Sequence, residues 1–199
     1  MNEIDRKKLI GLLERMDLEA RHEQRLCVIG AAALILLGRP ARQTEDIDVW
    51  RPGSRLNDAD LRRAAEQAGL TYDPKDDAPK GPYIQIVNPG IVNLPRPKND
   101  VWPTGEESRV LWQGRRVTVV CPPPAILVAA KLVRASDVDL DDLMYLVGVV
   151  GVTKTQIEHA IGSFPAREQD TARENLDLLK VMMDQAERRR RRKRKDDQR

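Results

Sequence analysis

The chain has 199 residues, which is long enough for one domain with a small helical appendage. Hydrophobic residues make up 41% and charged residues 33%, which excludes a wholly disordered chain, and the 4% of aromatic residues argue against a stacking surface for single-stranded nucleic acid. The net charge of +3 conceals an asymmetry, because residues 188–199 carry nine basic and two acidic side chains and leave the remainder mildly acidic.

The first part of the chain predicts a mixed α/β body. Apolar residues three to four positions apart indicate helices, and short apolar or alternating runs that end at glycine or proline indicate strands. In chain order, we expect a helix over 4–23, a strand over 26–29, a helix over 31–37, a strand over 46–50, a helix over 58–67 capped by Asn57, a loop over 71–82, strands over 83–87 and 91–94, a loop over 95–107, and a hairpin of 109–113 and 115–121.

From Pro122 onward the sequence predicts helices only, over 125–133, 140–149, 156–161 and 166–194. The predicted division is therefore an α/β core over 1–121, a helical layer over 122–187 and a basic, disordered tail over 188–199. A second interpretation lets the last helix run on into solvent as a basic arm.

Several classes of protein are disfavoured by what the sequence lacks. The longest uncharged apolar run, 28–38, holds eleven residues, whereas a membrane span needs about 20, and the first residues do not resemble a secretory signal. Cys27 and Cys121 lie in apolar runs, which favours buried, reduced thiols. His22 and His159 are far apart, which argues against a zinc site. We therefore expect a cytoplasmic protein without a membrane partner.

Two carboxylates lie two residues apart on the strand predicted over 46–50. Asp46 and Asp48 would point to the same face, with Cα atoms roughly 6.5–7 Å apart, while Ile47 and Val49 face the core. Neighbouring carboxylates repel each other, and a cation removes that repulsion: Mg²⁺ binds one or two carboxylates together with water and phosphate oxygens. The same pattern also occurs on solvated strand faces, so the pair needs a second feature beside it.

That second feature is Gly30, between the strand over 26–29 and the helix over 31–37. A residue without Cβ lets a phosphate approach the backbone, and the free N–H groups at the start of the helix, beginning at Ala31, would face that anion. Gly30 would equally suit close packing of the helix on the strand. Together with the two carboxylates, it predicts a nucleoside triphosphate bound with Mg²⁺.

In this order, Gly30-Ala31 and Asp46-Ile47-Asp48 resemble the nucleotidyltransferase superfamily. Arg42-x-Thr44-x-Asp46-Ile47-Asp48, with Lys131 and Asp139-Leu140-Asp141-Asp142-Leu143 downstream, is similar more narrowly to the abortive-infection (AbiEii-type) toxin nucleotidyltransferases and related small uncharacterised proteins. The resemblance covers residues 26–150. It implies an α/β (α+β) fold with a nucleotidyltransferase-like mixed sheet, flanking helices and a helical C-terminal layer.

The resemblance also implies a reaction and a role for each matching residue. A nucleoside monophosphate would pass from a nucleoside triphosphate to a hydroxyl of RNA, such as tRNA, or of protein, and positioning and charge neutralisation would supply most of the catalysis. Lys131 would pair with the triphosphate, and Asp142, or else Asp139, would orient or deprotonate the acceptor. A toxin role with a cognate antitoxin follows from the same resemblance. The metal would lie on Asp46 and Asp48, and the nucleotide would lie against Gly30, Ala31, Arg42 and Thr44.

Two positions depart from the superfamily pattern. Ala31 stands where Gly or Ser is usual, and Asn93, on the strand predicted over 91–94, stands where many members carry a third carboxylate. Because an amide adds no negative charge, the alternative is a catalytically inactive fold that binds nucleic acid or a partner. Lys131 and Asp142 also have purely structural interpretations. The stem of Lys131 would pack within an apolar helix, and Asp142 would be an acid near the start of a helix.

The basic segment is a candidate nucleic-acid contact. Eight consecutive cations repel one another, so they require a polyanion or solvent, and contact with an RNA backbone would depend on salt and not on sequence. The alternative is a solubilising tail. The candidate residues are Arg188, Arg189, Arg190, Arg191, Arg192, Lys193, Arg194 and Lys195.

Overall fold

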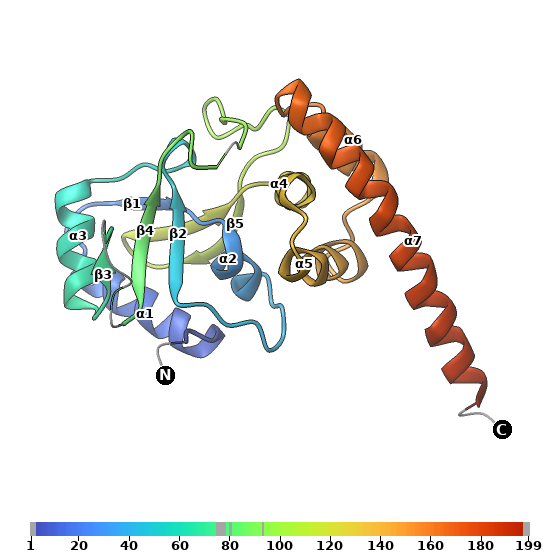
Figure 1. Ribbon diagram of the computed structural model, residues 1–199. Coiled ribbons are helices and arrows are strands. Elements are labelled where there is room, and N and C mark those ends of the chain that lie inside the picture. Colours follow the sequence, from blue (N-terminus) through green and yellow to red (C-terminus); the bar gives the residue numbers. More distant parts are fainter. Residues whose placement is uncertain (1–2, 75–78, 80, 93, 197–199) are drawn as a thin grey trace. The chain divides into compact units, whose positions relative to one another are not determined.

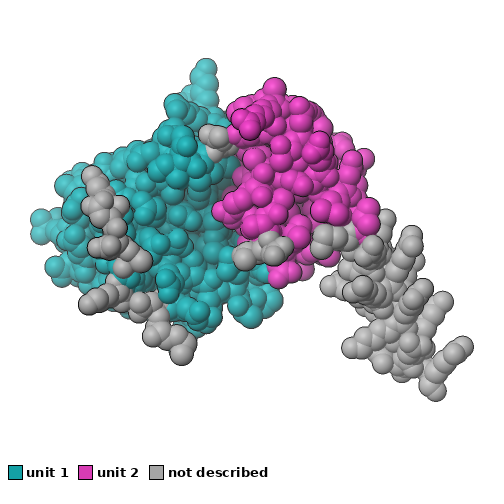
Figure 2. Space-filling model, in the orientation of Figure 1, with its two compact units in different colours: residues 1–123 teal, residues 124–199 magenta. Residues whose placement is uncertain are grey.

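The computed structural model describes residues 3–74, 79, 81–92 and 94–196, with the backbone alone for 137, 138 and 182–196. The chain forms two compact units, Met1–Pro123 and Pro124–Arg199, which Figure 2 colours separately. The first contains helices and strands and the second contains helices. The predicted fold class, a mixed α/β body with flanking helices followed by a helical layer, is confirmed.

One sheet of the first unit has the strand order β1-β6-β5. β1 (Gln24–Cys27) runs parallel to β6 (Val117–Cys121), and β6 pairs antiparallel with β5 (Arg109–Gln113). The predicted hairpin of β5 and β6 is confirmed, with Gly114 in its turn.

The second sheet is parallel and has the order β2-β4-β3. β2 (Asp46–Trp50) pairs with β4 (Tyr83–Val87), and β4 pairs with β3 (Thr71–Tyr72); Figure 1 shows β2 and β4 side by side. β2 and β4 have the predicted bounds. β3 lies within the predicted loop over 71–82. The sequence did not predict this strand because two residues are too few to show alternation.

The residues that follow β1 join the two sheets. Val28 forms an isolated antiparallel bridge with Val49 of β2, and its N–H donates to the carbonyl of Val120 at 2.7 Å. The N–H of Ile29 donates to the carbonyl of Asp48 at 2.9 Å. The chain leaving β1 therefore arrives directly beside β2.

Three helices accompany these sheets, and all three were predicted. α1 (Arg6–Glu19) buries Leu9, Leu12, Leu13 and Met16, which recur three to four residues apart. α2 is Gly30–Leu36, and α3 is Asp58–Gln67, with the side chain of Asn57 as its N-cap. A short 3₁₀ turn, Arg51–Gly53, follows β2.

The carboxylate of Asp17 on α1 holds the β5–β6 hairpin. It accepts backbone N–H groups from Arg115, Arg116 and Val117 at 2.9, 2.7 and 2.8 Å. Burial alone would raise the pKa of Asp17, but these three hydrogen bonds and the nearby charge of Arg115 outweigh burial and lower the pKa. A Cβ at Gly114 would collide with the same carboxylate, so glycine is required at this turn.

The strand predicted over 91–94 is wrong. Of its described residues, Val92 makes only an isolated bridge with Pro89, and Ile91 is 71% exposed. The cause is the turn before it: Gly90 has φ +98°, and the N–H of Ile91 bonds back to the carbonyl of Asn88. Asn93 lies outside the described residues.

Over its described residues, 124–196, the second unit consists of four helices, and each was predicted within a few residues. The polar N-caps Ser136 and Thr153 start α5 and α6 with capping boxes. In the part of the chain that the structure describes, no helix combines the length and apolar character that crossing a membrane requires. The helices are α4 (Pro124–Arg134), α5 (Asp137–Gly148), α6 (Lys154–Ile161) and α7 (Ala166–Asp196).

Candidate functional site

Asp46 and Asp48 lie on β2, as predicted, and alternate with core residues. Ile47 and Val49 are 1% and 0% exposed, whereas both aspartates are half-buried. Because side chains two apart on a strand share a face, the two carboxylates project from the same side of β2. This part of the predicted site depends only on local alternation.

Gly30 lies against Asp48 at the start of α2. Its φ is +64°, and a Cβ added to it would lie 2.5 Å from Oδ2 of Asp48. Any other residue at position 30 would therefore have a strained backbone conformation, and its Cβ would push the Asp48 carboxylate away. Ala31 follows in the first turn of α2 and is half-buried. The predicted neighbourhood of glycine and carboxylate is present in the structure.

Thr44 orients the other carboxylate. Its hydroxyl donates to Oδ1 of Asp46 at 2.6 Å. Its backbone is fixed by Ile4, through N–H···O bonds of 2.6 Å from Ile4 and 3.2 Å from Thr44. Arg42, two residues earlier, is half-buried, and its Nη1 donates to the carbonyl of Gln43 at 2.9 Å. The structure thus engages Thr44 with Asp46, and a nucleotide contact by Thr44 or Arg42 stays a prediction.

Tyr83 borders the same carboxylate from β4. Its hydroxyl lies 3.5 Å from Oδ2 of Asp46, and Asp46 and Tyr83 are register partners. Burial and the nearby charges of Asp46 and Asp48 raise the pKa of Tyr83, so the phenol stays protonated and remains a hydrogen-bond donor. The sequence did not predict Tyr83 as a site residue, because it comes close to Asp46 only through the pairing of β4 with β2, which no local pattern shows.

The register partner of Asp48 on β4 is Gln85. The amide of Gln85 donates to Oδ1 of Asp73 at 2.9 Å, and the same oxygen accepts the N–H of Ile86 at 3.0 Å. On the strand that pairs with β2, the residue opposite Asp48 is therefore Gln85, whereas Asn93, which the sequence placed on a neighbouring strand, lies outside the described residues. Gln85, like Asn93, carries an amide. Within the described ranges, no cluster of three or more His, Cys, Asp or Glu side chains could hold a metal ion.

The donor set nevertheless fits a Mg²⁺ ion. Mg²⁺ is usually bound by one or two carboxylates and completes its octahedron with water and phosphate oxygens. Asp46 and Asp48 supply two half-exposed carboxylates on one strand face, and Gly30 leaves the backbone beside them without a side chain. A Mg²⁺ ion on the two acids, shared with a phosphate beside Gly30, stays a prediction.

Lys131 and Asp142 belong to the second unit, where they form a buried ion cluster with Asp139. Nζ of Lys131 lies 2.8 Å from Oδ1 of Asp139 and 2.7 Å from Oδ2 of Asp142. Lys131 is 8% exposed, and both aspartates are fully buried. The cluster joins α4 to α5.

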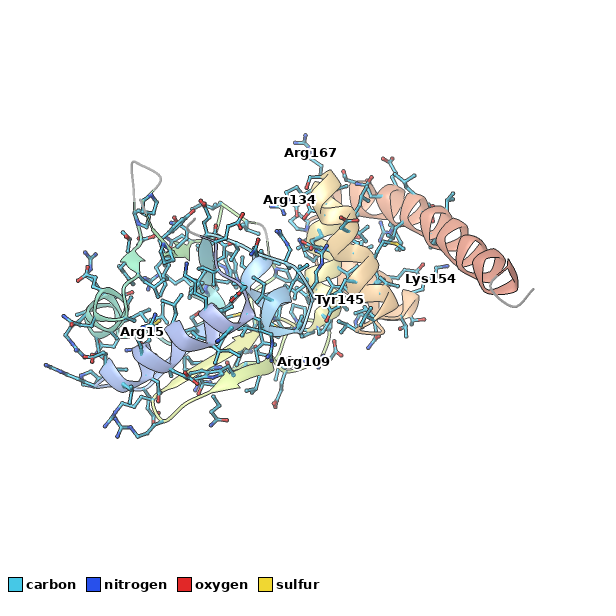
Figure 3. The ribbon with its side chains drawn as sticks, turned by 90° about the horizontal axis from the view of Figure 1, so that it is seen from below. Arg15, Arg109, Arg134, Tyr145, Lys154 and Arg167 are labelled. Carbon is cyan, nitrogen blue, oxygen red and sulfur yellow. The ribbon has the colours of Figure 1, made fainter. Side chains whose placement is uncertain are left out.

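Asp139 has further partners at the helix ends. Nε and Nη2 of Arg134, which Figure 3 labels on α4, donate to its two oxygens at 2.6 Å each, and the Ser136 hydroxyl donates at 2.6 Å. Burial would raise the pKa of Asp139, but the bonds from Arg134, Lys131 and Ser136 lower it. The cluster thus has a structural function, and catalytic roles for Lys131 and Asp142 stay predictions.

The basic segment lies at the end of α7. The helical backbone reaches Asp196 and includes residues 188–195, but the side chains of 182–196 lie outside the described part, and so do residues 197–199 entirely. The predicted nucleic-acid contact by this segment, and the division of the chain at 187, stay predictions.

Comparison with known proteins adds one match. A family model described as "Nucleotidyltransferase of unknown function (DUF6036)" matches residues 7–156. No curated protein and no solved structure matches the chain significantly. The matched range contains every candidate site residue named above except those of the basic segment.

Proposed function

Because the chain belongs to this family of nucleotidyltransferases of unknown function, we propose that it transfers a nucleoside monophosphate from a nucleoside triphosphate to a hydroxyl group. The observation that carries the proposal is the contact between Gly30 and Asp48. Because Gly30 has a positive φ and no side chain, the half-exposed carboxylate of Asp48, a proposed metal ligand, lies directly against the first turn of α2, where backbone N–H groups would face a phosphate. Close packing of α2 on β2 would not by itself require an acid there.

In this mechanism Asp46 and Asp48 would hold Mg²⁺. The bound ion would neutralise negative charge on the phosphate oxygens of the substrate. The hydroxyl of Thr44 keeps the Asp46 carboxylate in one orientation, and the phenol of Tyr83 supports its other oxygen. Gly30 and Ala31 would border the phosphates, and the guanidinium of Arg42 would contact them. The chain would contribute chiefly position and charge.

The roles of Lys131 and Asp142 are a finer proposal that rests on the sequence resemblance. Lys131 would contact the triphosphate and Asp142 would orient the acceptor hydroxyl. Because both are engaged in the buried ion cluster, these roles require the cluster to rearrange when substrate binds.

The proposed acceptor is RNA, such as tRNA, with a protein hydroxyl as the alternative. The eight cations over 188–195 support a polyanionic acceptor. Arginine and lysine side chains contribute most to nucleic-acid affinity when they contact phosphates.

Purified protein incubated with each of the four α-labelled nucleoside triphosphates, Mg²⁺ and either total RNA or cell lysate is expected to transfer label to a macromolecule. Asp48→Asn removes one metal ligand at nearly constant volume, so it is expected to lower the rate at least about 100-fold. Asp170→Asn is the matched control, because Asp170 is exposed on α7, and it is expected to keep full activity. Equal rates in both variants would contradict the proposed site.

A toxin function, neutralised by a partner antitoxin, is the second finer proposal. The arrangement of Arg42, Thr44, Asp46 and Asp48 supports it through the resemblance to abortive-infection toxins. Expression of the chain in a bacterial host is expected to arrest growth, and Asp48→Ala is expected to relieve the arrest. If the chain is an active transferase and its expression does not slow growth, the toxin function is contradicted, whereas the proposed transferase activity is not.

A second candidate function is a catalytically inactive fold that binds nucleic acid or a partner protein. The amide of Gln85 beside Asp48 favours it, because a third carboxylate is absent from the described surroundings of the pair. Thermal unfolding separates the two functions: an active site stabilises the protein by about 2.7 kcal/mol when nucleotide with Mg²⁺ is present at 100 times its dissociation constant. An inactive binding fold would retain RNA and show no such shift.

A further inference from the structure

A cationic cavity lies at the opposite end of β1 from Gly30. It has a volume of about 480 Å³ and is lined at the starts of β1 and β6 and at the hairpin turn between β5 and β6. Among the described residues, its charged lining consists of four arginines and one acid, Glu23. The arginines are Arg25, Arg55, Arg115 and Arg116.

The positive charge of this cavity is only partly compensated. Asp100 serves two arginines: its Oδ1 lies 3.4 Å from Nε of Arg25, and its Oδ2 pairs with Arg55. Nε of Arg25 is buried and makes no hydrogen bond among the described residues. Among the described residues, the side chains of Arg115 and Arg116 make no hydrogen bond or ion pair, although the charge of Arg115 also acts on the nearby Asp17 carboxylate. Two guanidinium groups are thus available to an anion.

The hairpin holds these two arginines in place. The Asp17 carboxylate accepts the backbone N–H groups of Arg115 and Arg116 and so fixes the turn from which their side chains project. Three backbone N–H groups bind the Asp17 carboxylate, which also interacts with the charge of Arg115. Thr118 and Gln113 add a hydroxyl and an amide to the lining. A rigid turn lowers the entropy lost when a ligand binds.

We propose that this arginine cavity binds phosphate groups, carried either by a nucleic-acid strand or by a free nucleotide. Guanidinium groups match phosphate oxygens with paired donors, and a concave cationic surface concentrates anions. All four lining cations are arginines, and the cavity is large enough for more than one phosphate. Gly30 lies five positions beyond Arg25 along an extended chain, or roughly 16 Å away, so this phosphate is distinct from the one that would be transferred. The inference does not depend on the proposed transfer reaction.

The test compares two double variants of the full chain. Arg115→Ala with Arg116→Ala removes the two available guanidinium groups. Arg96→Ala with Arg109→Ala removes the same charge from exposed positions outside the cavity; Figure 3 labels Arg109 on β5. Both retain the basic segment, so any contribution of residues 188–195 cancels. Thermal unfolding checks that both variants fold.

Binding of a short single-stranded RNA, of ATP and of inorganic phosphate is measured in EDTA, which removes metal-dependent binding at Asp46 and Asp48. The cavity variant is expected to bind RNA at least fivefold more weakly than the control. Its salt slope should be smaller by about 1.4, since each of the two lost phosphate contacts on a single strand contributes about 0.7. Weaker binding of RNA alone identifies a strand as the source, and weaker binding of ATP or phosphate identifies a free nucleotide. Affinities equal to those of the control for all three ligands would overturn the proposal, whatever the outcome of the transfer assay.

Discussion

Gly30→Ala is expected to reduce nucleotide transfer about 100-fold, since catalytic groups displaced by about an ångström lose activity on that scale. The new Cβ would lie 2.5 Å from Oδ2 of Asp48, so the carboxylate must rotate away from the bare backbone. An alanine at a φ of +64° also costs about 1–2 kcal/mol of folding stability. Activity should therefore fall far more than stability, as measured by initial rates and by urea unfolding.

Gly69→Ala is the matched control for this substitution. Gly69 follows α3 with a φ of +88°, and a Cβ there meets no atom within 4 Å. It therefore imposes the same kind of backbone strain without touching Asp48, and we expect a similar loss of stability with unchanged transfer. If the two variants lost activity equally, the contact between Gly30 and Asp48 would have no part in catalysis.

Lys131→Met is expected to destabilise the protein by about 3–5 kcal/mol, because one partner of a buried ion cluster is removed. Arg134 still compensates Asp139, whereas the buried carboxylate of Asp142 loses the cation that lies 2.7 Å away. Lys154→Met, at a lysine of α6 that pairs with Glu158 on the surface, is the control (Figure 3), and we expect it to change stability by less than about 0.5 kcal/mol. Urea unfolding measures both.

Replacing Asp142 by Leu in the Lys131→Met background should restore most of the lost stability, since a well-packed apolar pair substitutes for a buried ion pair. A Lys131→Met variant as stable as the parent would contradict the structural function of the cluster.

Acid provides a second readout of the same cluster. The pKa of Asp139 is lowered from its ordinary value of 3.8, so its stabilising contribution is present above that pH and is lost as the pH falls. Asp139→Asn should therefore be less stable than the parent at pH 7 and lose less further stability between pH 5 and pH 3.

Features that depend on local chain geometry could be predicted from the sequence. The alternation of Asp46, Ile47, Asp48 and Val49 predicted β2, and the glycine before an alanine-rich run predicted the turn into α2. These same local signals supplied the candidate site. Cap residues such as Asn57 likewise predicted where a helix begins.

Features that depend on pairing between distant segments could not be predicted. The sequence pointed to Asn93 as the neighbour of the carboxylates, whereas parallel pairing of β4 with β2 places Gln85 opposite Asp48. The family resemblance suggested that Lys131 contacts phosphate, and nothing local in the sequence shows that Asp139 and Asp142 lie within ion-pair distance of it across a helix boundary. The arginine cavity has the same origin, because three separate segments contribute its cations.

Residues that precede the first helix of a domain often tolerate substitution, but Ile4, ahead of α1, is an exception. It is fully buried, and its main chain pairs with that of Thr44, whose hydroxyl in turn sets the angle of Asp46. Ile4 should accordingly tolerate substitution no better than an interior position does. A bulky purification tag fused immediately before it would disturb its pairing with Thr44 and so change the orientation of the Asp46 carboxylate.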